Sequence, residues 1–174
     1  MAVKIQRFEG AGGRGYVDPG EGRDMQKIII DCDPGIDDAL AIFLALASRD
    51  DIEVLGLTCV KGNVSVDKAF LNAQRICAAA GRLDIPVLRG IARPILAPAD
   101  LEASVHGEDG LGDIGLPLPD HCPETGMHAV DFILQQVEKY PGEVVLCPIG
   151  PMTNVAVALL LDPSLGQKLH SIAF

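Results

Sequence analysis

The sequence predicts an α/β fold: an open, mostly parallel sheet with helices on both faces. Short apolar, β-branched segments alternate with segments of helical periodicity along most of the chain, and this alternation is typical of a parallel sheet that is covered on both sides. The 174 residues, of which 48% are hydrophobic and 22% charged, are enough for one such domain. A core-like strand runs into the end of the chain, so we expect a truncated version of this fold.

The first half of the pattern begins after a Gly-rich leader. Residues 27–31 are a short β-branched run and predict a buried strand. Residues 37–48 have helical periodicity, and residues 53–60 predict a second strand. A helix is expected over residues 66–80, because Gly81 supplies a C-terminal stop.

The second half repeats the alternation after a short strand at residues 86–88. Residues 94–123 are rich in Pro, Gly and Asp and predict a long loop. A helix over 129–140 and a buried strand over 143–147 follow. The helix over 153–161 is stopped by Asp162-Pro163, and residues 170–174 predict one more strand.

Residues 1–25 are predicted to be a flexible leader or an added expression sequence, with residues 26–174 forming part of a single domain. Gly10, Gly12 and Gly15 have the G-x-G-x-x-G spacing of a dinucleotide-binding loop. Such a loop requires a helix directly after it, whereas turn-forming residues follow here. Met25 immediately precedes the first strand, which favours it as the original start.

Composition argues against several classes of protein. The net charge of −10 repels phosphate backbones, and aromatic residues make up only 4% of the chain, so no nucleic-acid partner is expected. No apolar run reaches the roughly 18 residues that a membrane span needs. The five cysteines are scattered without a C-x-x-C pair, a usage typical of reduced thiols in a cytoplasmic protein.

The segment 31–38 carries the strongest chemical signal. Asp31, Asp33, Asp37 and Asp38 place four carboxylates within eight residues, directly after the first strand. The carboxyl ends of strands in open α/β sheets are where ligands bind. A cation relieves the repulsion between such carboxylates, and oxygen ligands favour Ca²⁺ or Mg²⁺. The alternative is structural: Asp37 or Asp38 caps the helix and Asp31 faces solvent.

Residues 27–41 resemble the D-x-D-P-G-x-D-D signature of the inosine-uridine preferring nucleoside hydrolase family. Further similarity follows in the same order from about residue 26 to the end of the chain. It lies in the Gly-Asn loop at 58–63, Asn72-Ala73, an H-G-x-x-G loop at 105–112, His128 to Val130, and a G-P-x-T-N turn at 148–154. We therefore identify the chain as similar to the amino-terminal part of a nucleoside hydrolase.

The resemblance implies calcium-dependent hydrolysis of the N-glycosidic bond of ribonucleosides, with a small-molecule nucleoside as substrate. It implies that Asp33, Asp38 and the backbone carbonyl of Ile149 bind Ca²⁺, and that Asp33 is the catalytic base. Asp37, Asn63 and His106 would bind the substrate. For Asn63 and His106 the residues alone also allow a turn role and a solvated loop role.

The family pattern continues beyond these residues, with a Met-Gly-Gly strand end, an Asn-rich sugar-binding loop and a late His-Asp pair. A chain without them is expected to bind calcium weakly and to turn over poorly, so a catalytically inactive fragment is the alternative function. An acidic D-x-D after the first strand also occurs in phosphatases of the haloacid dehalogenase type, but Pro34-Gly35 and the second acid pair argue against that class.

The resemblance also suggests a homo-oligomer when the protein is full length, in the cytoplasm and without a membrane partner. The preference for purine or pyrimidine nucleosides and the oligomeric state are left open by the sequence.

Overall fold

The computed structural model describes residues 25–96, 104–120 and 125–174. The leader predicted over residues 1–25, apart from Met25, lies outside the described residues, as do residues 97–103 and 121–124 of the long loop and with them Cys122. In the described part no helix is both long enough and apolar enough to cross a membrane.

Five parallel strands form one sheet in the order β3-β2-β1-β4-β5. The strands are β1 (Gln26–Cys32), β2 (Ile52–Cys59), β3 (Val87–Arg89), β4 (Val144–Pro148) and β5 (Ser171–Ile172). Strands β2 and β3 follow on one side of β1, and β4 and β5 then lie on the other side. The order therefore reverses between β1 and β4, which makes the carboxyl ends of these two strands the topological switch point of the sheet.

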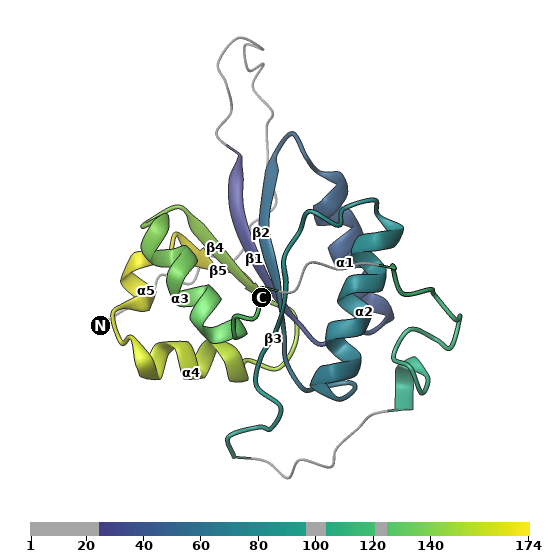
Figure 1. The fold of residues 1–174 in the computed structure, drawn as a ribbon. Helices are drawn as coiled ribbons and strands as arrows, with labels where there is room; N and C mark the ends of the chain where they lie inside the picture. Colours follow the sequence, from purple (N-terminus) through teal and green to yellow (C-terminus); the bar gives the residue numbers. More distant parts are fainter. Residues whose placement is uncertain (1–24, 97–103, 121–124) are drawn as a thin grey trace, which may run out of the picture.

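Helices cover both faces of the sheet (Figure 1). Helices α1 (Ile36–Ala47) and α2 (Val66–Ala79) pack on one face, and α3 (Ala129–Lys139), α4 (Thr153–Leu161) and α5 (Leu165–Lys168) pack on the other. Strand β1 shows why two layers form: Ile28, Ile30 and Cys32 belong to the core beneath α1 and α2, whereas Ile29 belongs to the core beneath α3 and α4. Alternate side chains of a strand point to opposite faces, so an apolar strand needs cover on both.

The predicted order of strands and helices is confirmed, with small shifts at the ends of elements. The helix 153–161 agrees with α4 at both ends, while the strand expected over 170–174 is only the two-residue β5. The short helix α5 and a 3₁₀ turn, η1 (Ser104–His106), were not predicted. Neither is long enough for a periodic pattern to develop.

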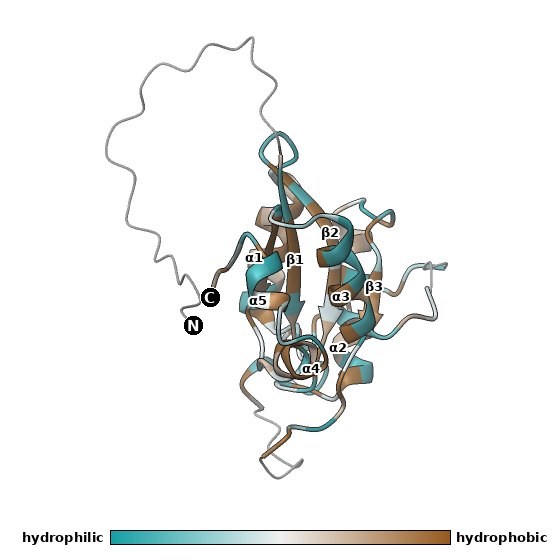
Figure 2. Ribbon diagram, turned by 90° about the vertical axis from the view of Figure 1, so that its left-hand side faces the viewer, coloured by the Kyte–Doolittle hydropathy of each residue, from teal (hydrophilic) through white to brown (hydrophobic). Residues whose placement is uncertain are grey.

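Helix α4 is apolar on more than its buried side (Figure 2, where it is seen end-on). Asn154, Val155 and Ala158 are buried, but Leu160 and Leu161 are exposed. On the opposite layer α1 exposes Ile36, Leu40 and Leu44 at helical spacing. Both helices therefore leave apolar side chains exposed on the surface of the described residues.

Candidate functional site

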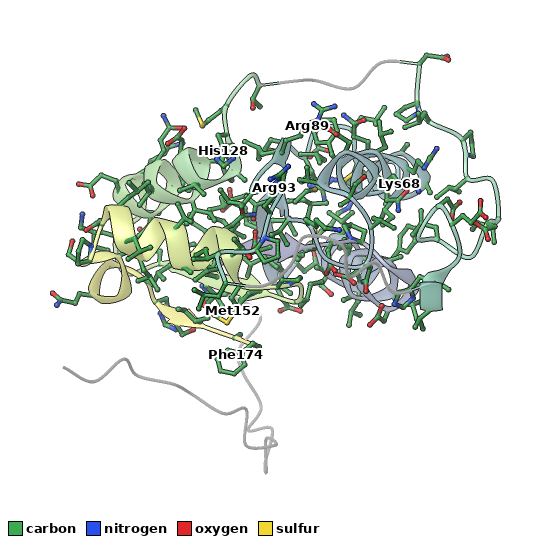
Figure 3. All side chains as sticks on the ribbon, turned by 90° about the horizontal axis from the view of Figure 1, so that it is seen from below. Lys68, Arg89, Arg93, His128, Met152 and Phe174 are labelled. Carbon is green, nitrogen blue, oxygen red and sulfur yellow. The ribbon has the colours of Figure 1, made fainter. Side chains whose placement is uncertain are left out.

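The predicted site residues lie at the switch point, where the carboxyl ends of β1 and β4 meet. The carbonyl of Asp31 accepts hydrogen bonds from the amides of Ile149 (2.8 Å) and Gly150 (3.2 Å), so the turn after β4 is attached to the end of β1. The carbonyl of Cys32 accepts from the amide of Val60 at 3.0 Å, which attaches the loop after β2. Figure 3 looks onto this edge of the sheet, with Arg89 at the end of β3 and Met152 before α4 labelled.

Asp33 is enclosed between two glycine-containing loops and is only 4% exposed. Its Oδ2 accepts a hydrogen bond from the amide of Asn63 at 2.5 Å. A Cβ on Gly62 would overlap this carboxylate, and a Cβ on Gly150 would lie 2.5 Å from Asp33 Oδ1. Burial raises the pKa of Asp33, the hydrogen bond from Asn63 opposes the rise, and the charges of Asp37 and Asp31 add to it. These surroundings make Asp33 a better proton acceptor than an exposed aspartate.

Asp38 lies in the first turn of α1 and is 5% exposed. Its Oδ2 accepts from the amide of Gly35 at 3.2 Å, so it satisfies a free amide at the start of its own helix, as the structural alternative proposed. Its Oδ1, in contrast, is buried and finds no hydrogen-bond partner among the described residues. Burial and then the charge of Asp33 raise the pKa of Asp38 to about 6. Capping therefore accounts for one of its oxygens and leaves the other available to a ligand.

Asp37, Asn63 and His106 converge around Gly35. A Cβ at this glycine would lie 2.9 Å from His106 Cδ2 and 3.0 Å from both Asn63 Nδ2 and Asp37 Oδ1. His106 Nε2 lies 3.7 Å from Asp37 Oδ1, and the Asp37 side chain is 79% exposed while that of His106 is 17% exposed. The three side chains thus form a polar rim beside the buried Asp33 and Asp38.

The four aspartates of segment 31–38 do not converge on one point, contrary to the simplest expectation from their spacing. Among the residues the structure describes, no three Asp, Glu, His or Cys side chains are grouped to bind a metal ion. Asp37 points outward, and Asp31 is fully buried in hydrogen bonds to Thr58 and Asn154. The suggestion that Asp31 faces solvent is therefore wrong. Asp33 and Asp38 remain as the close carboxylate pair.

The loop that carries His106 is tied to the turn before α1. The amide of Gly112 donates to the carbonyl of His106 at 2.7 Å. Asn72, buried on α2, donates to the carbonyls of Asp109 (2.7 Å) and Pro34 (3.3 Å). Asp113, which has a positive φ of 56°, exchanges hydrogen bonds of 3.0 Å with Asp109. The acidic residue after Gly112 therefore closes this loop on itself.

Asp31 was expected only as one carboxylate of the acidic segment, and Thr58 and Asn154, which donate to it, were not expected to shape the site. Asn154 belongs to the recognised G-P-x-T-N turn, yet nothing in its local sequence shows that its amide reaches the ends of other strands. A separate cavity of about 250 Å³ lies between β3 and the start of α3 and is lined by Phe70, Arg89 and His128 among others. It contains none of the predicted site residues.

The sequence and the fold are similar to those of known proteins. Residues 28–174 match the inosine-uridine preferring nucleoside hydrolase family. The chain is 43% identical over 148 residues to uridine nucleosidase 1 of Arabidopsis thaliana, covering 84% of this chain and 44% of that protein. The described fold is similar to a solved plant nucleoside hydrolase, with a TM-score of 0.80, 40% identity, and coverage of 86% of this chain and 47% of that one.

A purine-preferring ribonucleoside hydrolase from Gardnerella vaginalis is similar to the fold as well, with a TM-score of 0.79 and 34% identity, covering 84% of this chain and 47% of that one. The chain thus spans about half the length of the relatives it matches.

Proposed function

This chain belongs to the inosine-uridine preferring nucleoside hydrolase family, and we propose that it serves calcium-dependent hydrolysis of the N-glycosidic bond of ribonucleosides. The observation that carries the proposal is the pair of buried carboxylates, Asp33 and Asp38, at the switch point beside the turn after β4. The rim of Asp37, Asn63 and His106 beside this pair suits a ligand with several hydroxyl groups.

The arrangement of oxygens fits a hard cation. Asp38 presents a buried oxygen without a partner among the described residues, and a buried polar atom is normally satisfied. Burial and neighbouring carboxylates raise the pKa of both Asp33 and Asp38, so a cation that offsets their negative charges would suit this position. Asp33, Asp38 and the carbonyl of Ile149 would bind Ca²⁺. When bound, the ion supplies positive charge that makes a water molecule more acidic and attracts hydroxyl oxygens.

The reaction forms a bond between a water oxygen and the ribose carbon C1′ and breaks the bond from C1′ to the base nitrogen, whose electron pair leaves with the base. Asp33, whose carboxylate is buried in the site, accepts the proton of the attacking water as general base. Asp37 accepts a hydrogen bond from a ribose hydroxyl, and Asn63 and His106 orient the sugar. Positive charge develops on the ribose ring as the bond breaks, and the anionic side chains stabilise it.

The test measures ribose released from inosine, uridine and cytidine by the full chain, with added CaCl₂ and with a chelator. Calcium titration calorimetry runs in parallel on the same protein. Asp33→Asn, which keeps the shape of the side chain and removes the base, serves as the inactive control. Ribose release that depends on calcium and on Asp33 supports the proposal. Calcium binding without ribose release supports the alternative of an inactive fragment, and loss of both binding and release contradicts the proposal.

A cytoplasmic location and a homo-oligomeric state belong to the same proposal. Cys32 and Cys59, which are register neighbours on β1 and β2, are both free thiols, as expected in a reducing compartment. The exposed apolar row of Ile36, Leu40 and Leu44 offers surface for association. Cell fractionation and sedimentation of the full chain test these two points.

A further inference from the structure

Asn154 is a fully buried polar residue that bonds to three other parts of the sheet. Its Nδ2 donates to Asp31 Oδ1 (2.8 Å) and to the carbonyl of Cys59 (3.1 Å). Its Oδ1 accepts from the amide of Ile91 at 2.8 Å. One amide group therefore contacts the carboxyl ends of β1 and β2 and the segment after β3. Its NH₂ group donates to two oxygens, and its oxygen accepts from a backbone N–H.

These bonds do not serve the helix in which Asn154 lies. Helix α4 begins after Met152 and has no side-chain cap, and these three partners of the Asn154 amide all lie outside this helix. The approach of the β3 segment requires Gly90, because a Cβ there would overlap both polar atoms of the Asn154 amide and the Cys59 carbonyl. Because only glycine at position 90 leaves room for the Asn154 side chain, this contact is a specific part of the structure.

Asp31 connects the same network to the candidate site. Its Oδ1 accepts from Thr58 Oγ1 (2.6 Å) as well as from Asn154, whereas its Oδ2 has no hydrogen-bond partner among the described residues, and its side chain is completely buried. Its carbonyl accepts from the amides of Ile149 and Gly150. Asp33 follows two residues later. The loop after Cys59 carries Asn63, whose amide donates to Asp33.

We propose that Asn154 and Asp31 form a buried clamp that positions the three site-bearing segments: the turn at Asp33, the loop at Asn63 and the turn at Ile149. Both are positioning residues, and the effect of the clamp on catalysis rests on the proposed function. In a water-free interior the three bonds of Asn154 and the bond from Thr58 hold these segments together, and removing one partner leaves a buried polar group unpaired, which is unfavourable. The clamp thereby fixes the spacing between the two proposed calcium-binding segments of β1 and β4.

The test is Asn154→Asp in the full chain, which keeps the size of the side chain but places an acceptor against Asp31 and the Cys59 carbonyl. Hydrogen exchange is measured by mass spectrometry on peptides spanning residues 60–64, 90–92 and 149–151, and calcium affinity by calorimetry. We expect exchange in these segments to rise by about tenfold or more relative to the central strands. We expect the calcium dissociation constant to rise about 10- to 100-fold.

The matched control is Ile133→Ala, which destabilises the fold through a cavity beneath α3 without touching the clamp. It should raise exchange without preference for the three segments and leave calcium affinity unchanged. Adding Asp31→Asn to Asn154→Asp should recover part of both losses, because the amide introduced at position 31 then donates to the carboxylate introduced at position 154. If Asn154→Asp itself does not fold, Thr58→Val removes one donor to Asp31 and should give a smaller change of the same kind.

The clamp is refuted if Asn154→Asp behaves like Ile133→Ala, with uniform exchange and unchanged calcium affinity. If the unaltered chain binds no calcium, the proposed metal site fails, but the exchange pattern still decides whether the clamp exists. The two proposals can therefore fail independently.

Discussion

Replacing Gly150 by alanine tests whether the turn after β4 forms one wall of the site. The new Cβ would lie 2.5 Å from Asp33 Oδ1 and 3.0 Å from the Asp33 amide nitrogen. Ordinary contacts of carbon with neighbouring atoms are about 3.5 Å, so the carboxylate must move by about 1 Å. Gly150 does not have a positive φ, so alanine brings no backbone strain of its own.

The expected size of the effect follows from what Asp33 loses when it moves. Rotation weakens the 2.5 Å hydrogen bond from the Asn63 amide to Asp33 Oδ2, and a hydrogen bond to a charged group contributes about 1.5–3 kcal/mol. An off-rotamer side chain costs about 0.5–1.5 kcal/mol in addition. Allowing for partial relaxation, we expect calcium affinity to fall about 10- to 100-fold, which corresponds to about 1.4–2.8 kcal/mol.

Calcium titration calorimetry at constant pH measures this loss, with thermal unfolding of the metal-free protein recorded in parallel. The control is Gly142→Ala, which precedes β4 at the opposite edge of the sheet, has a φ of 81° and would place its Cβ in open space. It should cost about 1 kcal/mol of stability through backbone strain and leave calcium affinity unchanged. Wild-type calcium affinity in Gly150→Ala would refute the assignment of Asp33 and this turn to one metal site.

Three further outcomes are expected. Asp38→Asn should abolish measurable calcium binding, which calorimetry checks. It should nevertheless stabilise the metal-free fold at pH 7, because burial raises the pKa of the Asp38 carboxyl to about 6. Chemical unfolding checks this second part, and a destabilised metal-free variant would contradict the reasoning. The contribution of Asp31 and Asp38 to the stability of the metal-free protein should be greatest below about pH 4 and should be lost as pH rises to about 6, because burial raises their folded-state pKa values above the ordinary 3.8. The loss is at most about 3 kcal/mol for each group, and unfolding midpoints that stay level from pH 4 to 7 without calcium would argue against it. His106→Ala should raise KM for the nucleoside about tenfold while calcium affinity stays constant. The reason is that His106 lies on the rim and not between the carboxylates. A parallel loss of calcium affinity would place His106 in the metal site.

Much of the fold could be predicted because its cause is local. The β-branched run in β1, the helical period of α2 and the Asp162-Pro163 stop after α4 depend on neighbours within a few residues. The resemblance in residues 31–38 likewise rests on a contiguous motif. For these features one sequence is sufficient, and the structure adds only shifts at the ends of elements.

The side on which each aspartate points was not predictable in the same way. The alternation of side chains along β1 directs Asp31 toward the layer of α3 and α4. There Asn154 and Thr58 donate hydrogen bonds to its carboxylate. Asp37 and Asp38 are adjacent in sequence, yet one side chain is mostly exposed and the other buried, because successive residues of a helix face different directions. The four aspartates of segment 31–38 thus separate into the buried Asp31, the close pair of Asp33 and Asp38, and Asp37 on the rim.

The sequence by itself determined the alternation of strands and helices, the position of the acidic loop after the first strand and the family to which both point. Only the tertiary structure decided that the ends of β1 and β4 are neighbours, that Gly62 and Gly150 enclose Asp33, and that the Asn154 amide joins three strand ends. The physical reason is that propensity and periodicity act over a few residues, whereas strand order and register bring together residues that are far apart in the chain, such as Asp31 and Asn154.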